Sequence, residues 1–115
     1  MRKGLLVGLV CLLALTPSAS AECPLSLPGP VLITSLGQNL DGLIVRTMLA
    51  DLDIEAEFQP LARGSELNGF KQLIVSPGVS FKGLAASGLT FEEEVARGEA
   101  LIAAAEECRC ELILV

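Results

Sequence analysis

The chain has 115 residues, 51% of them hydrophobic, and a formal net charge of −6 at pH 7. This length accommodates one domain, since domains cluster near about 100–150 residues. The acidic balance argues against binding to nucleic acid or to anionic lipid headgroups, which attract clusters of Lys and Arg. The absence of histidine excludes a Ser-His-Asp triad, a Cys-His pair and a histidine metal site within these residues.

The first 21 residues have the order of a secretory signal peptide. Arg2 and Lys3 precede an apolar run over residues 5–15, and small residues stand at Ala19 and Ala21. The apolar run is shorter than the about 20 residues that span a bilayer. We therefore predict cleavage after Ala21 and a secreted or periplasmic protein. The mature chain would have six basic and fourteen acidic residues, a net charge of −8.

Three cysteines would remain after cleavage, and their positions allow a disulfide. Cys23 precedes the first predicted strand, and Cys108 and Cys110 stand where the last predicted helix leads into the last strand. Both places lie at the same end of a parallel sheet, so Cys23 could pair with either partner outside the cytosol. Three reduced cysteines are the alternative. We expect no metal and no cofactor, because three cysteines without histidine make a poor ligand set.

In chain order, residues 22–29 form an extended lead-in to a domain over residues 30–115. The run Val31–Thr34 is apolar and β-branched, as in a strand buried on both faces. Asn39 is a good N-cap for an amphipathic helix over residues 40–52. The apolar face of that helix consists of residues at helical spacing: Leu40, Leu43, Ile44, Met48 and Leu52.

The middle of the chain predicts an edge strand and then a buried one. Residues 54–58 alternate strictly between apolar and polar side chains, which is typical of an edge strand. Residues 59–69 predict a loop with a turn or two of helix around residues 65–67. Leu73–Val75 predicts a buried strand that ends at Ser76–Gly78.

The last third predicts a loop, a helix and a strand. Residues 79–89, rich in glycine and serine, predict a long irregular connection. Thr90 and Glu93 form a capping box for a helix that ends near Glu107, and Glu92–Glu94 are expected to be solvated. Its apolar stripe comprises Phe91, Val95, Leu101, Ile102, Ala105 and Cys108, with Gly98 allowing close approach to the sheet. Residues 112–115 predict a third buried strand.

This alternation predicts an α/β fold, a three-layer doubly wound parallel sheet with the flavodoxin-like order 2-1-3-4. Because the sequence ends on a strand of buried character, we expect the domain to be C-terminally incomplete.

The candidate ligand site lies at the carboxyl ends of the first and third predicted strands, which are neighbours in this order. Their loops supply hydroxyl, amide and backbone N–H groups and one cation, which suit a carboxylate or phosphate. The residues are Ser35, Gly37, Gln38, Asn39, Ser80, Lys82 and Gly83. Ordinary turn chemistry is the alternative. The sequence disfavours FMN, because the loop is poor in Ser and Thr and the chain has no Trp or Tyr. Neither loop matches a dinucleotide or P-loop pattern.

Several segments resemble a family of secreted bacterial domains of unknown function with a flavodoxin-like, Rossmann-like fold. They are Pro30–Gln38, Pro60–Ala62, Leu67–Lys71 and the glycine-rich Ser80–Leu89, in which Phe81 replaces a small residue. The resemblance covers nearly all of the mature chain and implies the fold and export. It also implies that members continue past Val115 with a loop bearing glycine and arginine, and it assigns no activity.

Three functions are compatible with the sequence. The first is an exported module that binds a small, anionic ligand at the two loops. The second is a hydrolase or transferase whose remaining catalytic residues lie in a missing C-terminal segment, with Ser35 or Ser80 activated by Lys82 as the conceivable nucleophile. The third is a structural or interaction module of the cell envelope, marked by an exposed apolar edge. The oligomeric state is not determined by the sequence.

Overall fold

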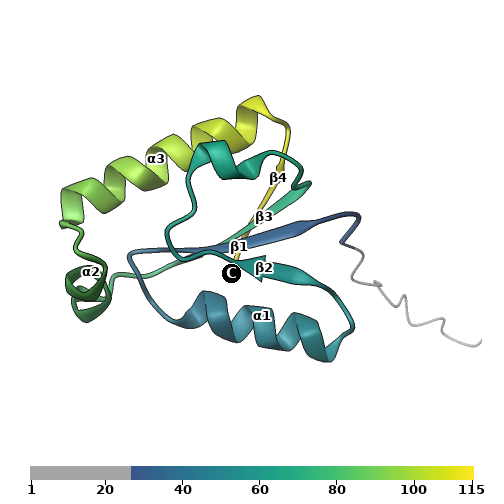
Figure 1. The fold of residues 1–115 in the computed structure, drawn as a ribbon, viewed down its shortest axis with the longest axis horizontal. Helices are drawn as coiled ribbons and strands as arrows, with labels where there is room; N and C mark the ends of the chain where they lie inside the picture. Colours follow the sequence, from purple (N-terminus) through teal and green to yellow (C-terminus); the bar gives the residue numbers. More distant parts are fainter. Residues whose placement is uncertain (1–26) are drawn as a thin grey trace, which may run out of the picture.

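The computed structural model describes residues 27–115. The predicted signal peptide, most of the lead-in and Cys23 lie outside the described residues. Four parallel strands form one sheet in the order β2-β1-β3-β4 (Figure 1). They are β1 (Val31–Leu36), β2 (Ala56–Phe58), β3 (Gln72–Pro77) and β4 (Glu111–Leu114). The predicted α/β fold and its strand order are confirmed.

Helices cover both faces of this sheet. Helix α1 (Asp41–Asp51) lies on one face and α3 (Phe91–Glu107) on the other, with the short helices η1 (Gly64–Leu67) and α2 (Phe81–Ser87) in the connections (Figure 1). Two hydrophobic cores result, one on each face. The core under α3 is built around Leu32, Leu73 and Leu101, and the core under α1 around Ile33, Leu49 and Ile74.

Helix α1 forms where the sequence predicts it but packs through a different face. Its buried residues are Gly42 and Leu49, with Val45 partly buried between them. The five residues predicted as its apolar face are all exposed, from 41% for Leu43 to 73% for Leu40. The helix approaches the sheet at Gly42, where an added Cβ would lie 2.7 Å from Cε2 of Phe58. The face of α1 that contacts the sheet is therefore the one that carries the small residue Gly42.

Two further predictions about the helices are wrong. Residues 81–87 are not irregular but form α2, because the Ser80 hydroxyl accepts a hydrogen bond from the Gly83 N–H and Gly88 ends the helix in the left-handed region. The buried face of α3 is Glu94, Gly98, Leu101 and Ala105. Phe91 and Val95 are exposed, so the predicted stripe is only partly correct, and Glu94 is not solvated.

The two edge strands differ in character. Strand β2 alternates, with Glu57 exposed between the partly buried Ala56 and Phe58, as predicted for an edge. Strand β4 was expected to be buried, yet it lies at the other edge with Leu112 and Leu114 exposed. It pairs with β3 on one side and with no described strand on the other. Strand β4 therefore has the apolar sequence of an interior strand but lies at an edge of the described sheet.

Candidate functional site

The loops that follow β1 and β3 pack directly against each other, as the strand order predicts. The Ser80 N–H donates to the Gly37 carbonyl at 2.7 Å, and Gln38 forms an antiparallel bridge with Val79. Gly37 has a φ of 97°, and an added Cβ there would lie 2.4 Å from the Gly78 carbonyl oxygen. Only glycine fits this junction without displacing backbone.

Asn39 ties the two loops together through its side chain. Its Nδ2 donates to the carbonyl oxygens of Ser76 and Gly78 at 3.0 and 2.9 Å. Its Oδ1 accepts from the Ser76 hydroxyl and from the Asp41 N–H. The N-cap of α1 is Leu40, so the predicted N-cap at Asn39 is off by one residue. Asn39 precedes the N-cap and still accepts from the first N–H of the helix, that of Asp41. All of its side-chain hydrogen-bonding capacity serves the fold.

A buried carboxylate lies at the centre of this region. Oε1 of Glu94, a side chain only 4% exposed, accepts from the Gly37 N–H at 2.7 Å and from Nε2 of Gln38 at 3.1 Å. Arg97 donates to both oxygens of the same carboxylate, from Nε to Oε2 at 2.8 Å and from a terminal nitrogen to Oε1 at 2.7 Å. Gly37 and Gln38, two of the predicted ligand-binding residues, therefore donate to a carboxylate of the protein itself.

These donors decide the charge state of Glu94. Burial by itself raises the pKa of the carboxyl, because it penalises the ionised form. The hydrogen bonds from Arg97, Gly37 and Gln38, with the positive charge of Arg97, outweigh burial and bring the pKa below its ordinary value. Arg97 is itself anchored by the carbonyl oxygens of Ala62 and Ser35 at 2.8 and 2.5 Å. The pair is ionised at neutral pH.

The structure brings the seven predicted site residues to one end of the sheet, and most of them bond to each other. The hydroxyl of Ser35 donates to the Asn39 carbonyl, and Gln38 also donates to the Pro60 carbonyl and accepts from Ser87. An added Cβ at Gly83 would lie 2.1 Å from the Gln38 carbonyl oxygen. The side chain of Lys82 is exposed. Whether these residues bind a ligand stays a prediction.

Glu94 and Arg97 are the functional residues that sequence reasoning missed. A signal for Glu94 was present, because it stands at helical spacing with Gly98, Leu101 and Ala105, which form the buried face of α3. The glutamate was grouped with its exposed neighbours Glu92 and Glu93 instead. Arg97 stands three residues after Glu94, a spacing that allows an ion pair on a helix. Its other partners, the carbonyl oxygens of Ser35 in β1 and Ala62 after β2, are distant in the sequence.

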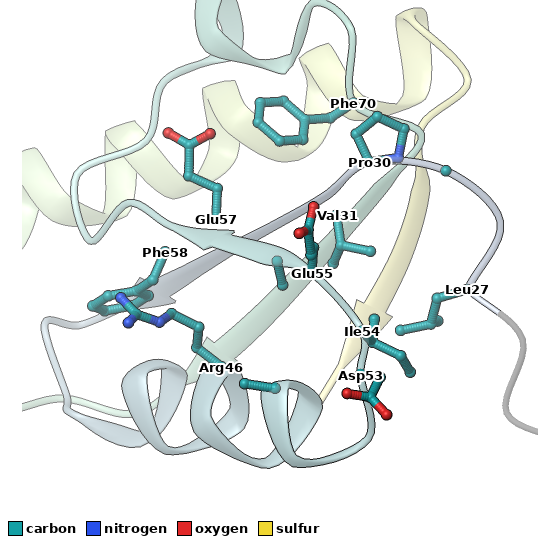
Figure 2. Close-up of a pocket in the computed structure, with 13 residues that line it drawn as sticks. Leu27, Pro30, Val31, Arg46, Asp53, Ile54, Glu55, Glu57, Phe58 and Phe70 are labelled. Atoms are coloured by element: carbon teal, nitrogen blue, oxygen red, sulfur yellow. The ribbon is translucent and has the colours of Figure 1, made fainter.

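A large open depression lies elsewhere, around the free edge of β2 (Figure 2). It is an open groove of about 1100 Å³ near the amino ends of β1 and β2. Phe58 and Arg46 lie on one side of β2, and Glu57 and Phe70 on the other (Figure 2). Its walls carry acidic groups at Asp53, Glu55 and Glu57 and a single arginine. This lining does not favour an anion.

A smaller cavity of about 360 Å³ borders the Glu94–Arg97 pair. It is lined by Arg63, Gly64, Leu89, Glu93, Arg97 and Ala100. Arg97 therefore binds the buried carboxylate of Glu94 and also lines this cavity. Within residues 27–115, no cluster of side chains is suited to a metal ion. No described helix is long and apolar enough to cross a membrane.

The family of a domain of unknown function, DUF6305, matches residues 28–115. This match covers all of the described strands and helices, and the chain belongs to that family. No curated protein and no solved structure matches the chain.

Proposed function

From membership in a family without assigned activity and from the geometry of the two loops, we propose that this chain is an exported domain that binds a small anion. The ligand is carboxylate-bearing and enters at the loops after β1 and β3. Export follows from the predicted signal peptide. The observation that carries the ligand class is the convergence of Gly37, Gln38 and Arg97 on one carboxylate.

The donor set suits a carboxylate for geometric reasons. Arg97 presents two adjacent nitrogens to the two oxygens of one group, which is the bidentate arrangement that matches a carboxylate. A backbone N–H and a side-chain amide complete the shell around one of these oxygens. The surroundings are buried, so each of these hydrogen bonds is stronger than it would be in water.

Binding of an external anion requires an exchange with Glu94. Glu94 is the fourth residue of α3, and the proposal requires its side chain to leave the buried shell. Breaking a buried ion pair costs about 3–5 kcal/mol, so a ligand must replace the contacts of Glu94 and add its own. Lys82 is exposed in the first turn of α2, next to Gly83, which packs against Gln38. We assign it the second anionic group of the ligand.

The test is a set of anion titrations monitored by thermal unfolding at constant ionic strength. Acetate, citrate and phosphate are compared with chloride in the wild type, Glu94→Gln, Lys82→Ala and Glu92→Gln. Glu94→Gln removes the competing charge, so it should respond to citrate at a concentration at least tenfold lower than the wild type. Lys82→Ala should weaken the citrate response of the wild type. Glu92→Gln, an equal charge change at an exposed position of α3, should behave as wild type.

Two results would contradict the proposal. One is a melting temperature that follows ionic strength alone, in both wild type and Glu94→Gln. The other is an equal citrate response in Glu92→Gln and Glu94→Gln, because net charge rather than the shell around Glu94 would then explain binding.

An interaction module is the second candidate function, and the contrast between the two sheet edges favours it. Strand β2 carries the alternation with exposed Glu57 that protects an edge, whereas β4 exposes Leu112 and Leu114. For a hydrolase or transferase, the described residues offer no activated serine. The Ser35 hydroxyl donates to the Asn39 carbonyl and the Ser80 hydroxyl accepts from the Gly83 N–H, with no described hydrogen bond to Lys82 from either.

A further inference from the structure

Helix α1 and its C-cap residue expose a row of large apolar side chains that flanks the core contacts of the helix. Ile44, Met48 and Leu52 follow one another at intervals of four residues and are 56%, 61% and 61% exposed. Residues four apart are neighbours on a helix surface, so they form one continuous strip, here called the outer stripe. Among residues 27–115, no other element covers this side of α1 (Figure 1).

The row adjoins the buried face, so the apolar surface of α1 extends beyond the part that packs on the sheet. Gly42, Val45 and Leu49 pack on the sheet, and a surface helix ordinarily turns a polar side away from such a core face. The apolar surface of α1 is therefore wider than the part that the sheet covers. Contiguous exposed apolar surface marks an interaction site in soluble proteins.

The charges beside the outer stripe indicate what packs on it. Asp41 lies three residues before Ile44 and Asp51 three residues after Met48, so both carboxylates adjoin the stripe. Both are exposed, and the single ion pair in the described part of the chain is the distant Glu94–Arg97 pair. A second copy of this chain would bring the same aspartates and the same strongly negative net charge together. Anionic membrane surfaces are repelled for the same reason.

We propose that the outer stripe of α1 binds a basic amphipathic helix of a partner protein. The partner helix presents apolar side chains at positions i, i+4 and i+8 that fit between Ile44, Met48 and Leu52. Lys or Arg residues beside that row pair with Asp41 and Asp51. This is the helix-on-helix mode of recognition, in which apolar side chains provide affinity and flanking charges set the orientation. It is independent of the anion site on the opposite side of the sheet.

The test uses a fluorescent synthetic helical peptide with leucines at i, i+4 and i+8 flanked by lysines. Its binding to the full chain is followed by anisotropy, with circular dichroism of every variant to establish folding. Ile44→Gln with Met48→Gln should weaken binding at least tenfold. Asp51→Asn should weaken it severalfold and reduce its dependence on salt. Leu43→Gln changes an exposed leucine of α1 away from the stripe and should leave binding unchanged.

Two peptide controls define specificity. A scrambled peptide of the same composition and a version with glutamates in place of the lysines should each bind at least tenfold more weakly. Equal binding to the stripe variant and the wild type would overturn the proposal. So would self-association in sedimentation that Met48→Gln abolishes while the peptide fails to bind, since a second copy would then occupy the stripe. Binding of the wild type to phosphatidylglycerol vesicles in place of the peptide would overturn it in favour of a membrane surface.

Discussion

At the scale of single residues, the molecule is organised around the ionised carboxylate of Glu94. Its neighbours are a backbone N–H, an amide and a guanidinium, and all three favour the charged form. The carboxylate in turn fixes the loop after β1 against α3, through a contact between residues 57 positions apart. One side chain therefore links the candidate site to the packing of the helix.

Glu94 should make stability depend on pH. Its pKa in the folded state lies below the ordinary value of 4.5, so the unfolded chain binds its proton more tightly than the folded one. The resulting stabilisation is fully present above about pH 5 and is lost as the pH falls through the folded pKa. Urea unfolding from pH 7 to pH 3 should show a steeper loss of unfolding free energy in the wild type than in Glu94→Gln. Glu92→Gln should retain the wild-type slope, and identical slopes in all three proteins would contradict this account.

At the scale of elements, α1 shows that the packing face of a helix can differ from its most apolar stripe. Gly42 allows the helix to approach Phe58 and Ser35, because an added Cβ would lie 2.7 Å and 3.0 Å from atoms of these side chains. Leu49 completes the contact. The large apolar residues, which dominate a hydrophobicity pattern, are left on the outside.

Neighbouring substitutions on α1 should separate the two faces. Leu49 is 6% exposed and Met48 is 61% exposed. Leu49→Ala should lower the unfolding free energy by about 2–5 kcal/mol, because it removes a buried side chain and leaves a cavity. Met48→Ala should change it by no more than about 0.5 kcal/mol. Chemical denaturation of the two variants measures both values. A larger loss of unfolding free energy in Met48→Ala than in Leu49→Ala would show that α1 packs through the face predicted from the sequence.

At the scale of the whole molecule, the described cysteines and the residues that lead into β1 lie at the amino end of the sheet. The register aligns Val31 with Gln72 and Gln72 with Glu111. Pro30 and Cys110, which precede β1 and β4, therefore both lie at the amino end of the sheet. Cys110 is buried, which together with Cys108 raises the pKa of its thiol, whereas Cys108 is exposed.

The disulfide of Cys23 with Cys108 or Cys110 stays a prediction, because Cys23 lies outside the described residues. Mature protein from an oxidising compartment should incorporate one equivalent of iodoacetamide after denaturation without reductant and three equivalents after reduction. Cys23→Ser should raise the first value to two. Labelling of all three thiols without reductant would show that the cysteines remain reduced.

The sequence by itself determined the types and order of the main elements, since each depends on local periodicity. It also determined the strand order, because alternation in residues 54–58 predicts an edge and crossovers between parallel strands are right-handed. Helix α2 was missed because its glycine and serine content resembles a loop. The adjacency of the two candidate loops followed from the strand order alone.

Only the tertiary structure decided which surfaces are buried. Glu94 is buried because Gly37, Gln38 and Arg97, distributed over two segments, satisfy its carboxylate together. Strand β4 is exposed because no described element lies beyond it. Helix α1 packs through Gly42 because a missing side chain leaves room for Phe58. Burial depends on partners distant in the chain, and periodicity within one segment carries no information about them.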